Sequence, residues 1–144
     1  MVFQQNILMS LFEIKSGTPS AEEFLYLRNS VEMGTRSLEG AKKGLGNELY
    51  GVLLYLRDSG ELVGMGRIVG DGGTVFHICD MVVKPECQKK GGGTMIMNQL
   101  MNFIDELGIS DAYVNLIADV DDFYQKWGFK TTRPNSKGMY LKTK

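Results

Sequence analysis

Cysteine and histidine are scarce in this 144-residue sequence, and long apolar runs are missing from it. The two cysteines, Cys79 and Cys87, are too few for a zinc site or a disulfide framework, so we expect reduced thiols and no metal. No apolar run reaches the roughly 18 residues that a transmembrane helix needs. Met1–Ser10 has no basic segment before its apolar residues, unlike a secretory signal. We therefore expect a cytoplasmic protein with no membrane partner.

An excess of charge of either sign is also missing. Lys and Arg number 16, Asp and Glu number 17, and the formal net charge is -1. Such a chain has no general attraction for nucleic acid, and it carries no aromatic–basic RNA motif. Hydrophobic residues make up 43% and charged residues 23%, which is typical of an ordered globular protein. At this length, residues 1–144 are predicted to form a single domain.

The first half of the sequence predicts a helix followed by an antiparallel meander. Asn6–Lys15 is a candidate strand, and the capping-box pair Ser20 and Glu23 predicts the start of a helix that runs to about Val31. Met33–Asn47 contains three glycines and is predicted to be a loop with at most one short helix. Three strands joined by tight turns should follow, over Leu49–Arg57, Leu62–Val69 and Thr74–Lys84.

The second half predicts a long helix and several short elements. Apolar residues recur at helical spacing from Thr94 and stop at Gly108, which predicts an amphipathic helix of about 14 residues. Because strand–helix–strand crossovers are right-handed, the strands before and after this helix should be parallel. The later predicted elements are strands at Ala112–Ala118, Phe129–Thr132 and Met139–Lys142 and a short helix at Asp119–Trp127. The expected fold class is α/β (α+β), a mixed, mostly antiparallel sheet with helices on both faces.

The glycine-rich loop before the long helix is a candidate anion site. Consecutive glycines let the backbone approach a ligand closely, and free amides at a helix N-terminus attract negative charge. The spacing excludes a nucleotide P-loop, which needs a Lys after its last glycine, and a dinucleotide-binding fingerprint. A flexible surface turn is the alternative. The residues that would bind a diphosphate are Gln88, Lys89, Lys90, Gly91, Gly92, Gly93 and Thr94.

The loop motif Gln88-x-x-Gly91-x-Gly93 resembles the Gln/Arg-x-x-Gly-x-Gly/Ala motif of the Gcn5-related N-acetyltransferases, the GNAT family. Further segments resemble the family in the same order over about residues 49–142. Val63–Arg67 is similar to its third strand, Asp80–Glu86 to its fourth strand and exit, and Phe123–Phe129 to its Phe-Tyr-x-x-x-Gly-Phe segment. Gly92 departs from the pattern, because the family usually has a bulkier residue there.

This resemblance implies acetyl-CoA as cosubstrate, held where the fourth and fifth strands, a parallel pair, splay apart. The backbone of Met81, Val82 and Val83 would pair with the pantetheine arm, and one N–H would polarise the thioester carbonyl. A primary amine of a small molecule or peptide would attack directly in a ternary complex, without a covalent enzyme intermediate.

The resemblance also suggests the residues that transfer protons. Tyr124 matches the family's usual general acid, and its alternative role is core packing. His77 and Asp80 are rival general bases, because imidazole titrates near neutrality and some members have a base on this strand. Strand alternation places the two on opposite faces unless a bulge intervenes. A water chain is the third candidate.

The acceptor is not readable from the sequence. Its expected lining is Met33–Asn47 and Arg133–Met139, and Glu32, Glu39 and Glu48 could bind a cationic amine or be solvated surface. A non-catalytic acyl-CoA-binding sensor or regulatory module is the alternative to the enzyme. The oligomeric state stays open, and a homodimer is one expectation.

Overall fold

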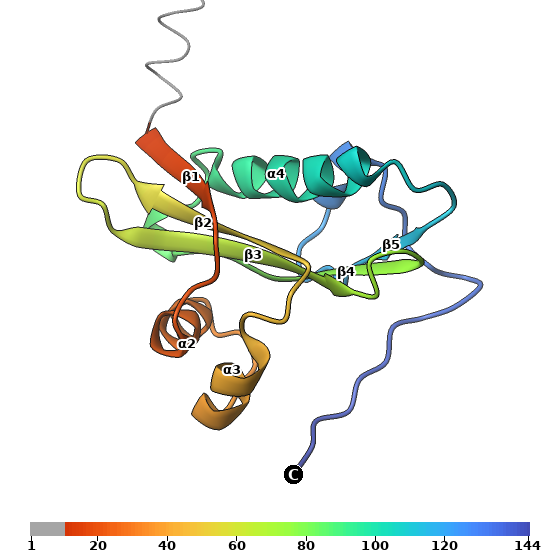
Figure 1. Cartoon of the computed structure of the whole chain (residues 1–144), viewed down its shortest axis with the longest axis horizontal. Coiled ribbons are helices and arrows are strands. Elements are labelled where there is room, and N and C mark those ends of the chain that lie inside the picture. Colours follow the sequence, from red (N-terminus) through yellow and green to blue (C-terminus); the bar gives the residue numbers. More distant parts are fainter. Residues whose placement is uncertain (1–10) are drawn as a thin grey trace, which may run out of the picture.

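The structure, a computed structural model, describes residues 11–144. It contains a five-stranded sheet in the order β1-β2-β3-β4-β5, in which only β4 and β5 are parallel. Helix α4 covers one face, and α2 and α3 cover the other (Figure 1). The predicted fold class is confirmed. The strands are β1 (Phe12–Ser16), β2 (Tyr50–Leu56), β3 (Leu62–Gly70), β4 (Val75–Val83) and β5 (Tyr113–Asn115), and the α-helices are α2 (Ala21–Ser30), α3 (Leu38–Gly44) and α4 (Gly92–Leu107).

The two helices on the first face begin at serine caps. Ser20 accepts a hydrogen bond from the Glu23 amide at 3.1 Å, and its own amide donates to the Glu23 carboxylate at 2.8 Å. This is the predicted capping box, which satisfies two amides that the helix itself cannot pair. Ser37 caps the short helix α3 by a single hydrogen bond, which its hydroxyl accepts from the Gly40 amide at 2.9 Å. Of the predicted first strand, residues 6–10 lie outside the described residues.

The meander of β2, β3 and β4 is confirmed, with strand ends within two residues of prediction. Asp71 builds the turn between β3 and β4, because its carboxylate accepts from the amides of Gly73, Thr74 and Val75. The Thr74 hydroxyl and these amides hold the pKa of Asp71 below its ordinary value. The Asp71 side chain therefore closes the predicted tight turn by hydrogen bonds.

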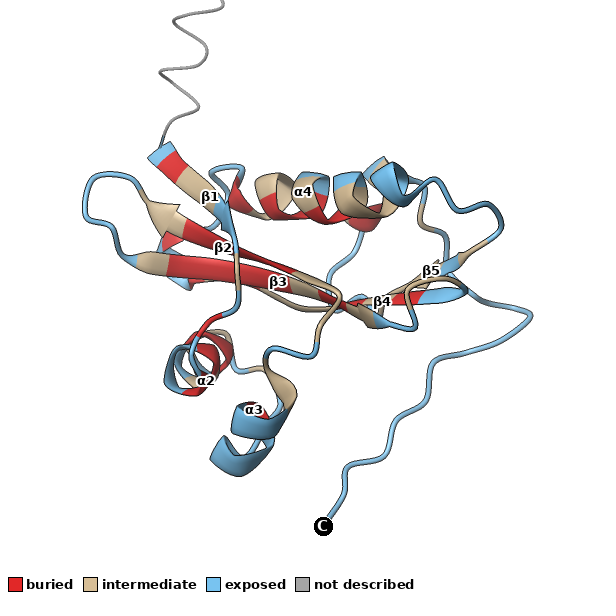
Figure 2. Cartoon of the chain, in the orientation of Figure 1, coloured by how far each residue is buried: buried red, intermediate tan, exposed pale blue. Residues whose placement is uncertain are grey.

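Helix α4 lies across the sheet with its apolar stripe buried. Ile96, Met97 and Leu100 have no exposed surface, and Gly108 ends the helix at a φ of 64°. Figure 2 shows that the side of α4 that faces the sheet is buried, as are the central parts of the strands below it. Burying three such side chains contributes on the order of 1.5–3 kcal/mol each to folding. Both the helix and its glycine stop were predicted, although the helix begins two residues before Thr94.

The C-terminal predictions are mostly wrong. Strand β5 has three residues instead of the predicted Ala112–Ala118, and the helix predicted at Asp119–Trp127 is a single 3-10 turn, η3 (Tyr124–Trp127). Asp122 has a φ of 61°, a left-handed conformation that interrupts an α-helix. The turn can therefore form only after this residue.

The two predicted closing strands do not form. Neither Phe129–Thr132 nor Met139–Lys142 belongs to the sheet, and Met139, Tyr140 and Leu141 are 82%, 87% and 84% exposed. A strand needs a neighbouring backbone to satisfy its amides and carbonyls. Because β5 is so short, it offers these segments little edge to pair with. The apolar alternation of these segments is typical of strands, but the segments do not pair with the sheet.

Candidate functional site

The glycine loop connects the end of β4 to α4 through the 3-10 turn η2 (Pro85–Cys87). Gly91 is the N-cap of α4 at a φ of 89°, and Lys89 also has a positive φ, of 63°. No side chain caps this helix end. The amides of the first helical turn, at Gly92, Gly93 and Thr94, cannot pair within the helix. They form a donor cradle with the positive end of the helix dipole, which suits a diphosphate.

Packing explains the glycines that follow the cap. A Cβ on Gly92 would lie 2.7 Å from Leu54 Cδ2 and 3.4 Å from the Phe12 ring. A Cβ on Gly93 would lie 3.3 Å from the Phe123 ring. In this chain the core side chains of β1 and β2 occupy the space that a bulkier residue at Gly92 would need. The departure from the family pattern is therefore compensated by neighbouring side chains.

The lysine-rich start of the loop is tied to the end of β4. The Gln88 side-chain amide donates to the Val83 carbonyl at 2.9 Å. The Lys90 ammonium lies 3.5 Å from the Glu86 carbonyl. These contacts fix the loop beside the last residues of β4, where Met81, Val82 and Val83 lie. The sequence motif and the strand segment are thus neighbours.

Strand β4 contains a bulge and diverges from β5. Its register with β3 pairs Met65 with Val82 and Arg67 with Cys79, which leaves Asp80 and Met81 opposite one residue, Gly66. Asp80 has a φ of 55° at this bulge. The pairing of β4 with β5 ends at His77 and Asn115, although β4 continues to Val83. Along the described residues, the edge of β4 beyond His77 has no strand beside it.

The bulge brings His77 and Asp80 to the same face of the sheet. Phe76 and Ile78 pack into the core beneath α4, so His77 between them faces the α2 side. Asp80 also faces that side, where it contacts Arg28 of α2. Alternation alone would have separated the two residues.

Asp80 lies in a buried cluster of charged residues. Its Oδ1 contacts Arg28 Nη1, and its Oδ2 contacts Arg67 Nη1 at 2.7 Å. Arg67 Nη2 is also 3.9 Å from Glu48. The exposed fractions of these side chains are 5% for Arg28, 13% for Arg67, 7% for Asp80 and 3% for Glu48. Both oxygens of Asp80 are therefore engaged by guanidinium groups.

His77 has a different environment. Its Nδ1 lies 2.6 Å from the amide oxygen of Asn115 on β5. An amide oxygen only accepts hydrogen bonds, so Nδ1 donates and the neutral ring carries its lone pair on Nε2. Nearby Cys79 is no rival, because burial and the Asp80 charge raise the pKa of its thiol to about 12. A thiol with such a pKa is neither a nucleophile nor a base near pH 7.

Tyr124 lies on the other face, within the core beneath α4. It is 8% exposed and packs edge-to-face against Phe123 and Phe129, at centroid distances of 5.0 and 6.3 Å. Burial and the charge of Asp119 raise the pKa of its phenol. The hydroxyl therefore stays protonated at neutral pH. Tyr124 also borders a groove of about 840 Å³ between β5 and residues 129–138.

A second cavity, of about 640 Å³, lies on the α2/α3 face. It touches the predicted 33–47 segment, but the predicted Arg133–Met139 segment borders the groove by Tyr124 instead. The three glutamates do not line this cavity. Glu39 pairs with Lys43 on the surface. Burial alone would raise the pKa of Glu48, but the Thr18 hydroxyl, two backbone amides and Arg67 hold it below its ordinary value.

Sequence reasoning missed the roles of Arg28, Arg67 and Lys142. A signal for two of them exists, because Arg28 shares the helical stripe of Phe24 and Leu27, and Arg67 interrupts an apolar strand. A charged residue in an apolar stripe usually has a buried partner. Within residues 11–144, no cluster of His, Cys, Asp or Glu could hold a metal ion, and no helix is long and apolar enough to cross a membrane.

Comparisons with known proteins identify the family. The model of the acetyltransferase (GNAT) domain matches residues 36–142. A probable acetyltransferase of unknown function from methicillin-resistant Staphylococcus aureus is 41% identical, with a TM-score of 0.86 over 92% of this chain and 99% of that one. An uncharacterised N-acetyltransferase of Porphyra purpurea is 32% identical over 120 residues, 82% of this chain and 69% of that protein.

A more distant neighbour contains the coenzyme. N-acetylglutamate synthase from Neisseria gonorrhoeae, complexed with coenzyme A and L-arginine, has a TM-score of 0.68 over 90% of this chain and 30% of that one. At 16% identity this likeness shows the fold alone. The family model over residues 36–142 and the two relatives above show the family. The chain therefore belongs to the GNAT family of acetyltransferases.

Proposed function

We propose that this chain transfers an acetyl group from acetyl-CoA to a primary amine of a small molecule or peptide, in a ternary complex. One observation carries the proposal: the free amides at the start of α4 lie beside the open edge of β4. The first feature supplies donors for a diphosphate and the second supplies donors and acceptors for an extended arm. Acetyl-CoA contains both groups in sequence.

The loop Gln88–Thr94 binds the pyrophosphate. Its amides donate to the phosphate oxygens, and Lys89 and Lys90 supply positive charge. The backbone of Met81, Val82 and Val83 pairs with the pantetheine arm as a further strand would. An N–H of this segment polarises the thioester carbonyl, whose oxygen gains negative charge as the amine attacks. The bulge at Asp80 comes directly before this segment of β4.

The amine nitrogen forms a bond to the thioester carbon, and the carbon–sulfur bond then breaks. The proton lost by the amine goes to a base, and the leaving thiolate takes a proton from an acid. Tyr124 is the acid in this account, because its raised pKa keeps the hydroxyl protonated. His77 is the base, acting through Nε2, directly or through water, while Asn115 holds the ring.

Asp80 is a positioning residue in this account and not the base. Its two oxygens are engaged by Arg28 and Arg67, and it occupies the bulge itself. The arginines therefore stabilise the left-handed backbone of the bulge at Asp80. Because the left-handed conformation costs on the order of 1–3 kcal/mol in a residue other than glycine, the ion pairs have to offset it.

The test is a thiol-release assay with acetyl-CoA and a panel of amino acids, aminoglycosides, polyamines and peptide N-termini. Mass spectrometry should show that at least one acceptor gains a single acetyl group on its amine, an increase of about 42 Da. A control without acceptor gives the hydrolysis rate. If acetyl-CoA binds but no amine is acetylated, the non-catalytic acyl-CoA sensor replaces the enzyme.

A further inference from the structure

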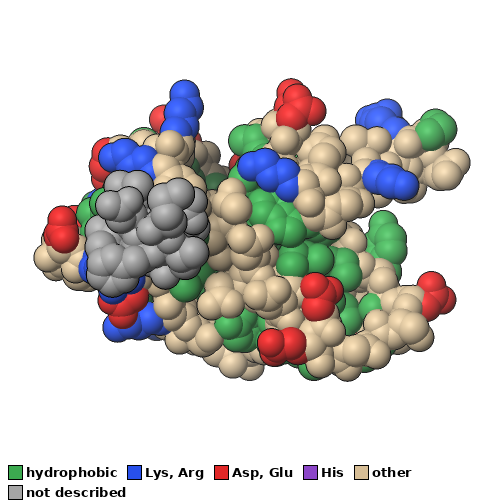
Figure 3. All heavy atoms as spheres, turned by 90° about the horizontal axis from the view of Figure 1, so that it is seen from above, with side chains coloured by type: hydrophobic (Ala, Val, Ile, Leu, Met, Phe, Trp, Pro, Cys, Tyr) green, Lys and Arg blue, Asp and Glu red, His purple; other side chains and the backbone are tan. Residues whose placement is uncertain are grey.

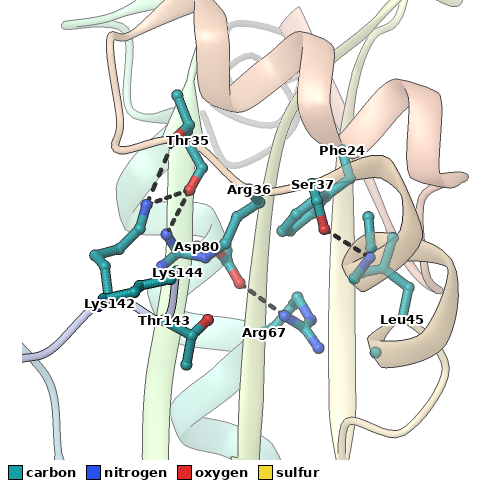
Figure 4. Close-up of a pocket in the computed structure, with 13 residues that line it drawn as sticks. Phe24, Thr35, Arg36, Ser37, Leu45, Arg67, Asp80, Lys142, Thr143 and Lys144 are labelled. Atoms are coloured by element: carbon teal, nitrogen blue, oxygen red, sulfur yellow. Dashed lines mark hydrogen bonds and ion pairs between the residues drawn. The ribbon is translucent and has the colours of Figure 1, made fainter.

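The cavity on the α2/α3 face is surrounded by positive charge (Figure 4). Arg36 comes from the connection between α2 and α3, Arg67 from β3, and Lys142 and Lys144 from the C-terminal segment. Asp80 is the one acidic side chain among the residues that line it. The chain as a whole is nearly neutral, so this concentration of cations is local.

Part of this charge is already balanced within the protein. Arg28 and Arg67 contact Asp80, and Arg67 also lies near Glu48, so these two cations face two anions. The cations left for a ligand are Arg36 and Lys142. Throughout residues 11–144, neither of these two has a carboxylate within ion-pairing distance.

The contacts that Arg36 and Lys142 do make are to uncharged groups. Arg36 Nη1 donates to the Thr35 carbonyl at 3.0 Å, and Lys142 Nζ donates to the same carbonyl at 2.6 Å. Lys142 thereby joins two segments 107 residues apart in the sequence at the mouth of the cavity. Guanidinium and ammonium groups form their strongest hydrogen bonds with carboxylates and phosphates, so this site has unused capacity for an anion.

We propose that this cavity binds the acceptor through an anionic group, a carboxylate or a phosphate, on the same molecule that carries the amine. This inference rests on the proposed acetyl transfer. Asp80 lies both in the cavity wall and in the bulge next to Met81, so the cavity adjoins the open edge of β4. The anionic group lies against Arg36 and Lys142, and the amine faces β4.

The charge also defines what the cavity rejects. An acceptor with only positive charges, such as a polyamine, meets the unbalanced cations Arg36 and Lys142 and is repelled. An acceptor with an anionic group is attracted. A volume of about 640 Å³ suits a small metabolite. The substrate class is therefore a small anionic amine.

Three matched amines test the proposal: ethylamine, β-alanine and O-phosphoethanolamine. They share an aminoethyl group and differ in having no anion, a carboxylate or a phosphate. The value of kcat/KM should be about tenfold or more higher for at least one anionic compound than for ethylamine. The reason is that only the anionic compounds can form a charge-assisted hydrogen bond with Arg36 or Lys142. The anionic compound with the higher kcat/KM shows whether the cavity prefers a carboxylate or a phosphate. Equal values for all three would overturn the proposal.

Charge reversal supplies the second arm. Arg36→Glu and Lys142→Glu should each remove most of the preference for the anionic amine and should favour ethylenediamine instead. The control is Lys42→Glu, which makes the same charge change at an exposed position of α3 outside the cavity and should keep the preference. If Arg36→Glu behaves as the control does, the anion does not lie in this cavity.

A binding measurement separates this proposal from the proposed reaction. Acetyl-CoA and β-alanine or O-phosphoethanolamine are each titrated into the protein by calorimetry. If acetyl-CoA binds and the anionic compounds bind to wild type but not to Arg36→Glu, the cavity assignment stands even without turnover. If acetyl-CoA binds and neither anionic compound does, the cavity assignment fails while the acetyl transfer survives. If acetyl-CoA itself does not bind, the proposed function fails first.

Discussion

The two faces of the sheet differ in how they are held together. Beneath α4 the contacts are apolar, and the face seen from that side shows hydrophobic side chains in its middle with charged ones around them (Figure 3). Beneath α2 a buried cluster of two arginines and two carboxylates accompanies a smaller apolar core. We propose that the cofactor binds backbone amides at the start of α4 and that the acceptor binds charged side chains on the α2/α3 face.

Breaking the charged face should have the largest effect. Asp80→Asn leaves Arg28 and Arg67 buried without their shared anion, which costs about 3–5 kcal/mol of the free energy of unfolding. Urea denaturation measures it. Arg28→Met should cost a similar amount, and the double variant should lose less than the sum, because the two side chains share one interaction. A loss below about 1 kcal/mol for Asp80→Asn, together with a large loss of turnover, would return Asp80 to a catalytic role.

On the apolar face, Tyr124→Phe should affect chemistry and not folding. Turnover should fall about 10²-fold, the lower range for a general acid, which corresponds to about 2.7 kcal/mol. The ring packing against Phe123 and Phe129 is kept. Because the phenol must be protonated and its pKa is raised, the fall in activity with rising pH should come above the ordinary tyrosine range. Equal turnover in both proteins would leave Tyr124 as a packing residue.

His77 lies at the last position where β4 pairs with β5. His77→Gln should lower kcat/KM about tenfold or more, because the side chain loses the nitrogen that takes the proton of the amine. Asn115→Ala should cause a smaller loss, because the ring loses its hydrogen bond and not its nitrogen. Equal kcat/KM in His77→Gln and wild type would point to a water chain.

The smallest effect is expected for an exposed ion pair near the charged face. Glu39 and Lys43 lie 3.2 Å apart on α3, and both side chains are 78% exposed. Glu39→Gln should change the free energy of unfolding by less than about 0.5 kcal/mol, because solvent screens such pairs. A much larger loss for Asp80→Asn than for Glu39→Gln would show that burial makes the ion pair of Asp80 important for stability. A loss of several kcal/mol here would show that charge alone governs the face.

The same division explains what the sequence could predict. The capping box at Ser20, the glycine stop at Gly108 and the loop Gln88–Thr94 depend on residues a few positions apart, so local spacing revealed them. Asp80 and Arg28 are 52 positions apart, and the bulge that joins them depends on strand register. Periodicity indicates that Arg28 and Arg67 are buried, but it does not identify their partner or the bulge. The pairing of these arginines with Asp80 could therefore not be predicted from the sequence.

The C-terminal segment shows the opposite error. Residues near Phe129 and Tyr140 alternate as strand residues do, yet they found no partner, because β5 has three residues. The local sequence pattern shows that a segment can form a strand, and a neighbouring backbone with free amides and carbonyls is needed for the strand to form. The prediction that the fourth and fifth strands are parallel is confirmed. It depended only on the helix between them, because strand–helix–strand crossovers join parallel strands.

The central claim is that acetyl-CoA binds at the start of α4, and calorimetric titration of acetyl-CoA into three proteins tests it most directly. Gly91→Ala and Gly91→Glu impose the same strain at a φ of 89°, where a Cβ would meet no atom, and they differ in charge and length. We predict that wild type and Gly91→Ala both bind acetyl-CoA and that Gly91→Glu does not. Equal affinity in folded Gly91→Glu, or a flat titration of wild type, would contradict the account.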